Sequence, residues 1–322
     1  MGADSGIPSL HHPQFDSIER ASDWLTPREP VVALEVNGEA RIYPIQIVMW
    51  HEVVNDVLGG DPVLVTFCPL CYTAIAFDRR VGGEVRDFGV SGLLRESDLI
   101  LYDYQTTTLW QQLTGDAVVG TDAGERLRFL PAQLVAFADA RAQYPDALVL
   151  SRQTGFNRAY GTNPYAGYDS VDSGPIFRTS FADDGRLPAK AQVLTFEVRA
   201  QPVAIPFDRL ANEVVVETTL EGIPVVALWQ PGTNAALDAR SIEDGRDIGA
   251  AGAFRAEIDG RPARFEAREG AIYDSDTGSR WNVLGTAVEG PLTGKRLQPL
   301  VSGTHFWFIW SVFKPDTTVL VE

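Results

Sequence analysis

The sequence is poor in residue types that mark several protein classes. Its 322 residues include two cysteines, four histidines and only three lysines. Two cysteines can form at most one bridge, which excludes a scaffold held together by several disulfides. Acidic side chains number 43 against 27 basic ones. Nucleic acid is therefore not an expected partner, because a phosphate-binding surface needs an excess of Lys and Arg.

Long apolar runs are also missing. The longest covers residues 63–77, which is too short for a membrane-spanning helix, and Pro69 interrupts it. No hydrophobic leader follows Met1, so we expect a chain that is soluble as given. The sequence leaves the compartment open: extracytoplasmic if a leader has been removed, and otherwise cytoplasmic. An apolar fraction of 45% and a charged fraction of 22% indicate an ordinary globular protein rather than a disordered one.

The sequence does contain an internal repeat. Residues 102–110 resemble residues 273–281, with Tyr, Asp, Thr and Trp recurring at matching positions. Weaker matches join Pro44 with Pro206 and Pro62 with Pro224. We therefore predict two related lobes from an internal duplication. The expected parts are an N-terminal segment (1–30), a first lobe (31–150), a Gly- and Tyr-rich loop (151–192) and a second, degenerate lobe (193–322). The loop is either an ordered cover or a plain connector.

Each copy has the pattern of mixed strand and helix. Asn37-Gly38 between two β-rich runs predicts a hairpin. Helical spacing of apolar residues predicts helices over residues 45–57 and 132–143, and the apolar run 62–67 predicts a buried strand. Strands dominate without regular alternation of strand and helix, so the expected fold class is α+β and β-rich. No Gly-x-Gly-x-x-Gly follows a strand, which argues against a dinucleotide site.

Both cysteines lie in one C-x-x-C motif, Cys68-Pro69-Leu70-Cys71, directly after the predicted strand. Such a pair can hold a metal ion, cycle as a redox dithiol or simply pack in the core. A thioredoxin-like motif places its first cysteine at a helix N-terminus, which lowers the thiol pKa. Residues 73–77 have a strand-like or ambiguous pattern rather than that of a clear amphipathic helix, so the redox interpretation is the weaker of the first two.

A metal site needs ligands beyond the two thiolates. His51, at the end of the predicted helix before the strand, is the third ligand that we expect; a buried histidine hydrogen-bonded to the sheet is the alternative. His305 lies in an apolar segment, where a core position is the better interpretation. Soft thiolates with few other ligands suit Cu(I), so copper is the expected ion and zinc the alternative. Residues expected to support the site are Glu52, Asn55, Tyr72 and Asp98.

The repeat provides an internal control. Aligned at Pro62 and Pro224, Cys68 falls opposite Gln230 and Cys71 opposite Thr233. Matching residues 52–54 with residues 213–215 places His51 opposite Asn212. A residue that serves only the shared fold should tend to occur in both copies. We therefore predict one functional site, in the first lobe.

Several stretches together resemble a known family. Residues 36–44, 51–56, 67–71, 88–93 and 306–308 are similar to the prokaryotic domain-of-unknown-function 3179 family, as are 97–99, 154–156, 164–168 and 315–317. The resemblance spans nearly the whole chain and implies no activity. It implies an export or lipoprotein leader in many members. Tyr72 departs from the pattern, which has a small residue there, often Gly, and is expected to narrow access to the thiols.

These observations predict a metal-binding protein that uses the thiolates of Cys68 and Cys71, either as a carrier or as a redox enzyme. The alternatives are a thiol–disulfide oxidoreductase acting through the same cysteines and a non-catalytic binding module in which they only pack. The expected partner is an unidentified small-molecule substrate or a metal donor. Neither nucleic acid nor a membrane span is expected.

Overall fold

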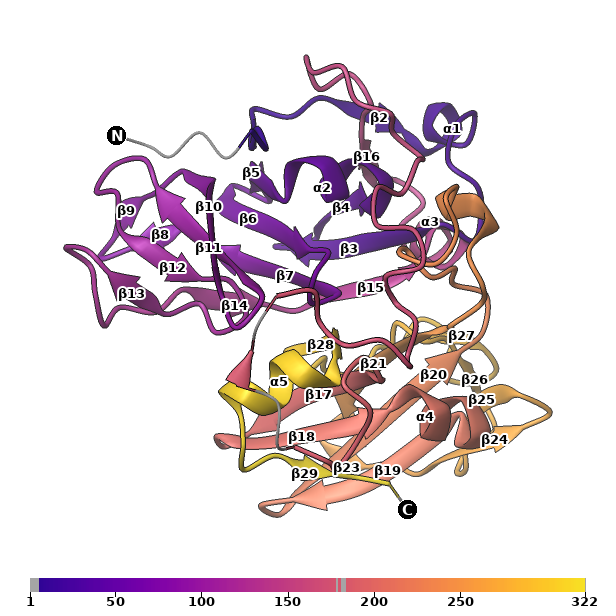
Figure 1. Ribbon diagram of the computed structural model, residues 1–322. Coiled ribbons are helices and arrows are strands. Elements are labelled where there is room, and N and C mark those ends of the chain that lie inside the picture. The colour runs from indigo at the N-terminus through magenta and orange to yellow at the C-terminus, as the bar shows by residue number, and fades with distance from the viewer. Residues whose placement is uncertain (1–5, 178, 181–183, 322) are drawn as a thin grey trace.

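The computed structural model describes residues 6–177, 179–180 and 184–321. Strands dominate, and the α-helices of the described residues are at most seven residues long. Figure 1 shows the first half of the chain, indigo to magenta, above the second half, salmon to yellow. The prediction of a β-rich chain with few helices is confirmed.

The first half contains three larger sheets and one small hairpin. One sheet has the order β1 (Leu10–His11), β5 (Val53–Leu58), β6 (Asp61–Cys68), β7 (Thr73–Asp78), β14 (Arg128–Leu130). The second has β15 (Ala132–Ala136), β3 (Pro30–Val36), β4 (Glu39–Pro44), β16 (Leu148–Leu150), β2 (Phe15–Ser17). The third has β10 (Phe88–Arg95), β11 (Asp98–Asp103), β12 (Leu109–Gln111), β13 (Ala117–Val119), and the hairpin is β8 (Arg80–Val81) with β9 (Glu84–Val85). The helices are α1 (Ile18–Ala21), α2 (Ile45–His51) and α3 (Phe137–Gln143).

The second half is built from similar pieces. Its first sheet has the order β28 (Ser302–Phe306), β17 (Gln192–Val198), β18 (Gln201–Pro206), β29 (Thr318–Val319). The second sheet has the order β19 (Val215–Leu220), β20 (Ile223–Gln230), β21 (Ala250–Arg255). The third has the order β24 (Phe265–Arg268), β25 (Ala271–Asp274), β26 (Arg280–Trp281), β27 (Ala287–Glu289). A small hairpin pairs β22 (Glu257–Ile258) with β23 (Arg261–Pro262). The helices are α4 (Phe207–Glu213), α5 (Trp307–Phe313) and the 3₁₀ turn η2 (Ile242–Asp244).

Part of the strand order and register is the same in the two halves. β15-β3-β4-β16 in the first half has the same pairing directions as β28-β17-β18-β29 in the second. Each element from β3 to β6 has a counterpart that begins 162 residues later, as β17 at Gln192 follows β3 at Pro30. At this spacing Glu52 lies opposite Val214, and both end a helix in the left-handed region, with φ of 57° and 65°. The expected match of His51 with Asn212 was therefore one residue off; its counterpart is Glu213.

The helix expected over residues 45–57 is shorter than its apolar spacing suggested. It ends at His51, because Glu52 adopts a left-handed backbone conformation and Val53 begins strand β5, which pairs with β6. The β-branched residues of this stretch favour strand once a pairing partner is available. The helix expected over 132–143 divides in the same way, into β15 and α3. The hairpin at Asn37-Gly38 is confirmed, with the two positive φ angles that a type I′ turn requires.

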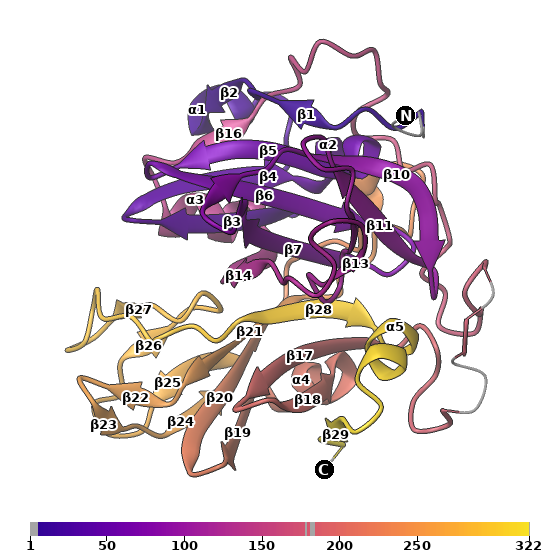
Figure 2. The ribbon, with the colours of Figure 1, turned by 90° about the vertical axis from the view of Figure 1, so that its left-hand side faces the viewer.

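One buried cluster joins the halves. Val193, Phe306 and Trp307 belong to the same hydrophobic core as residues of β5, β6 and β7. Strand β28 lies against the first half, as Figure 2 shows, and contacts β7 and β15. The segment between β16 and β17 has no α-helix or β-strand among its described residues. Its Tyr160 and Tyr165 pack against the shared core, so this segment covers the molecule as well as connecting its halves.

We expect the repeated aspartates to stabilise both halves equally. Asp103 accepts hydrogen bonds from Thr106 and from Trp110 Nε1, and Asp274 accepts them from Thr277 and Trp281 Nε1. Because each carboxylate is buried with its donors, Asp103→Ala and Asp274→Ala should each lower the free energy of unfolding by about 2–3 kcal/mol. Urea unfolding measures the change. A loss below about 0.5 kcal/mol in either variant would contradict this assignment.

Candidate functional site

The turn between β6 and β7 brings the two thiols together. Cys68 is the last residue of β6, and the Cys71 amide donates to the Cys68 carbonyl across the turn, with N and O 3.3 Å apart. The two Sγ atoms are 3.1 Å apart. Cys68 is 2% and Cys71 0% exposed, so both sulfurs lie inside the protein.

Asp98 completes a group of three ligand atoms. It begins β11, and its Oδ1 lies 3.3 Å from Cys71 Sγ. One ligand atom each from Cys68, Cys71 and Asp98 lie within 4.8 Å of one another. The other carboxylate oxygen of Asp98 accepts from Gln111 Nε2 at 2.5 Å and from the Leu113 amide at 2.9 Å. These bonds hold the carboxylate in a fixed orientation toward the thiols. We expected Asp98 only to support the site, whereas it lies in direct contact with Cys71. The role of Gln111 carried no signal in the sequence.

The buried side chains around the cysteine turn are acidic, and there is little positive charge near them to compensate for their ionisation. Burial raises the pKa of Cys68 and of Cys71, and raises that of Asp98 to about 6. Burial, together with the nearby Asp98, raises the pKa of Glu52 to about 8. No described basic side chain forms an ion pair with Glu52 or Asp98, and Glu52 has no side-chain hydrogen bond to a described residue. Ionising several of these groups together requires a cation, because an unpaired buried charge costs several kcal/mol.

His51 lies outside this group. It is the last residue of α2 and is fully buried; its Nδ1 is 2.7 Å from the Pro8 carbonyl oxygen, and its Nε2 is 2.6 Å from the Tyr160 hydroxyl. Burial lowers its pKa to about 4. His51 is thus a buried, hydrogen-bonded histidine, as in the alternative, but its partners are Pro8 and Tyr160 and not the sheet that was expected. Its assignment as a metal ligand stays a prediction.

Asn55 and Tyr72 hold the surrounding structure together. Asn55 donates to the Phe88 carbonyl and accepts from the Phe88 amide, both at 2.8 Å, and so joins β5 to β10. The Tyr72 hydroxyl accepts from the Ala236 amide of the second half at 2.9 Å, and its ring contacts Phe306. Tyr72 has a φ of 55°, in the left-handed region where glycine is at no disadvantage. This conformation explains why glycine suits the position.

The segment after β16 closes over the cysteine turn. The Tyr168 hydroxyl donates to the Leu70 carbonyl at 3.0 Å. Lys190 Nζ donates to the Tyr168 carbonyl at 2.6 Å and lies 3.5 Å from the centre of its ring. Tyr168 is itself only 8% exposed. The C-x-x-C motif is therefore covered by a fixed aromatic side chain and does not form an open surface site.

Comparison with known proteins identifies the family. A family model described as a protein of unknown function, DUF3179, matches residues 4–317. The chain belongs to this family. The resemblance found in the sequence motifs is thereby confirmed. No match was found among curated proteins or among solved structures. In the described part of the DUF3179 chain, no helix is long and apolar enough to cross a membrane. The family description gives no activity, so the function must be argued from the site.

We expect both thiols of the metal-free protein to react slowly. Burial and raised pKa values leave little thiolate at neutral pH, and the thiolate is the reactive form. Titration with a disulfide reagent near pH 7 should be roughly tenfold or more slower for the folded chain than for the chain in urea. A rate equal to that of the unfolded chain at either cysteine would contradict this and would favour the redox alternative.

We expect His51 to weaken the fold in acid. The folded chain keeps it neutral down to a pKa of about 4, whereas in the unfolded chain it takes up a proton near the ordinary histidine pKa of 6.5. The unfolded state binds more protons in this interval, so the free energy of unfolding falls as the pH drops. Between pH 6.5 and 4 the wild type should lose about 1–3 kcal/mol more than His51→Gln. Urea unfolding across this range tests it, with the exposed His12→Gln as control; equal losses in wild type and His51→Gln would refute it.

Proposed function

We propose that Cys68, Cys71 and Asp98 bind a metal ion and that this site is the functional centre of the protein. The observation that carries the proposal is the convergence of the three ligand atoms within 4.8 Å. They come from the end of β6, the following turn and the start of β11. A bound cation would replace the protons that burial otherwise holds on these groups, and so would supply the missing countercharge.

The donor set favours zinc over the copper expected from the cysteines alone. Two thiolates by themselves suit Cu(I), whereas a carboxylate oxygen beside two thiolates is a combination found among zinc ligands. Tetrahedral zinc with Zn–S bonds of ~2.3 Å would hold its sulfurs roughly 3.8 Å apart. The sulfurs, 3.1 Å apart, must then separate by about 0.7 Å, which a side-chain rotation can provide. Copper remains the competing ion.

Three protein ligands leave one position of a tetrahedral ion free. Glu52 lies outside the group of ligand atoms within 4.8 Å, but it is buried and its charge interacts with those of Asp98 and Cys68, so it is our candidate for that position. It could act as a fourth ligand or hold a proton beside the ion. The cover formed by Tyr168 favours an ion that is retained over one that is carried and released.

We further propose that the halves derive from one duplicated unit in which only the first half has the metal site. Strand order and register support a common origin. At matching positions the second half has Gln230 and Thr233 for the cysteines and Val214 for Glu52. Asp98 corresponds to Glu269, which is exposed in a tight hairpin between β24 and β25. None of these replacements preserves the ligand set.

Metal analysis tests the proposal directly. After reconstitution with Zn(II) or Cu(I) and gel filtration, we expect about one ion per chain for the wild type and almost none for Cys68→Ser/Cys71→Ser, because thiolates supply most of the affinity. Equal metal content in the wild type and the double serine variant would refute the proposal.

The contribution of the carboxylate is tested separately. Asp98→Asn should weaken zinc binding by about tenfold or more, since the amide keeps the shape but loses the negative charge. Glu269→Gln is the matched control, because it changes the corresponding residue of the second half and should leave the affinity unchanged. If Asp98→Asn and Glu269→Gln bind zinc equally well, Asp98 is not a ligand.

A further inference from the structure

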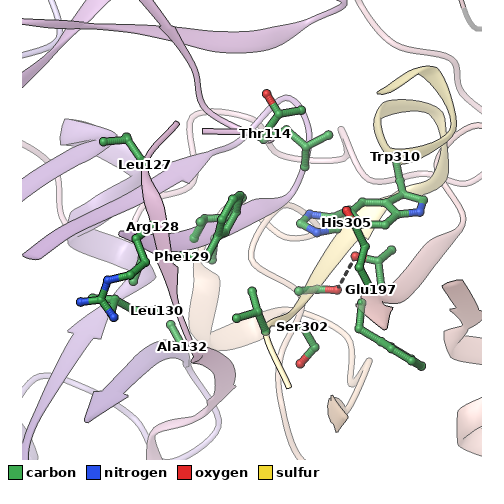
Figure 3. Close-up of a pocket in the computed structure, with 18 of the residues that line it drawn as sticks. Thr114, Leu127, Arg128, Phe129, Leu130, Ala132, Glu197, Ser302, His305 and Trp310 are labelled. Carbon is green, nitrogen blue, oxygen red and sulfur yellow. Dashed lines mark hydrogen bonds between the residues drawn. The ribbon is translucent and has the colours of Figure 1, made fainter. Parts of the chain in front are cut away.

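A pocket of about 360 Å³ lies where the two halves meet. Its walls come from β7 and β14 of the first half and from β17, β28 and α5 of the second. Figure 3 shows His305 and Trp310 side by side at one end, with Phe129 facing them from the first half. Most of its lining is apolar, including Leu113, Leu130 and Phe196. The volume and lining are those of a small-molecule site.

The charged side chains around this pocket are already paired. Arg128 forms an ion pair with Asp78 at 2.6 Å, and Lys314 forms one with Glu197 at 2.6 Å. The third cation, Arg126, is 3.4 Å from Asp116. An ionic ligand would have to break one of these pairs or leave its own charge uncompensated. The pocket is therefore matched to a neutral molecule.

His305 brings a buried acceptor to the pocket. It is 2% exposed, and its Nδ1 is 3.0 Å from Thr73 Oγ1. The Thr73 hydroxyl also lies 3.2 Å from the Cys71 carbonyl oxygen, which can only accept. We assign the hydroxyl proton to that carbonyl, and in this assignment Nδ1–H donates to Thr73 Oγ1. Nε2 consequently carries the lone pair, and no described residue hydrogen-bonds to it. Burial lowers the pKa of His305 to about 3, which keeps the ring neutral.

The surroundings fix this ring and leave its Nε2 edge open. Trp310 stacks on His305 with ring centres 5.6 Å apart and planes 5° apart. Gly303, which also lines the pocket, lies beside Nε2: a Cβ there would come within 2.6 Å of that atom. At Gly303, strand β28 therefore places only a hydrogen atom beside His305 Nε2, whereas any other residue would place a Cβ there.

We propose that this pocket binds a neutral, largely apolar small molecule whose single O–H or N–H group donates to His305 Nε2. Phenols, aryl alcohols and secondary aromatic amines have this chemistry. The apolar walls supply most of the affinity, and the hydrogen bond selects molecules that carry the donor, because a buried acceptor left without a partner costs free energy. The proposal does not depend on metal binding at the cysteines.

Fluorescence titration of the full chain with N-phenyl-1-naphthylamine tests the proposal, since this neutral probe has one N–H group. Its N-methyl derivative has the same aromatic body without the donor. We expect saturable one-to-one binding of the parent probe, about tenfold tighter than that of the N-methyl derivative, as the loss of one buried hydrogen bond predicts. In His305→Phe the two probes should bind equally. A wild type that binds both probes equally would overturn the role of His305.

A second pair of variants locates the binding. Val301 lines the pocket and is 45% exposed, so Val301→Trp can obstruct the mouth without disturbing the core. It should abolish saturable binding. Val288, 40% exposed on β27, lies outside the pocket, and Val288→Trp should bind as the wild type does. Unchanged binding in Val301→Trp, or no saturable binding by the wild type, would overturn the proposal.

Discussion

Both the cysteine turn and the contact between the two halves depend on the backbone carbonyl of Cys71. It accepts from the Thr73 hydroxyl of its own half and from the Phe306 amide of the other half, at 3.2 Å and 3.0 Å. The same residue carries the thiol that faces Asp98. The conformation of the cysteine turn and the contact between the halves are therefore set together. The buried contacts of Tyr72 with Phe306 and Ala236 reinforce this junction.

Burial of the acidic groups near this junction costs folding free energy, and the packing of the fold does not offset that cost. Cys68, Cys71, Asp98 and Glu52 are all buried, and burial favours the protonated form of each. Apolar residues would pack there without this cost, as Val214 does at the position that matches Glu52. Groups with pKa values shifted in this way cluster at functional sites, which supports the proposed metal site.

Much of this could be predicted from local sequence patterns. The Asn37-Gly38 hairpin depends on residues that tolerate positive φ, and it forms as expected. The C-x-x-C turn is also local, so the closeness of its thiols could be foreseen. The helix boundary at His51 could not, since apolar spacing continues into β5 and only pairing with β6 decides the outcome. Asp98 was expected nearby, but its direct approach to Cys71 depends on β11 and Gln111, which are set by tertiary packing.

The proposed binding pocket depends on the absence of a side chain at Gly303. One added methyl group would fall on the acceptor edge of His305, while the strand around it could keep its pairing with β17. A single amino-acid substitution at this position would thus remove the proposed ligand binding and leave the fold unchanged. Among relatives, the residue at this position would separate chains that still bind a ligand from chains that have kept only the architecture.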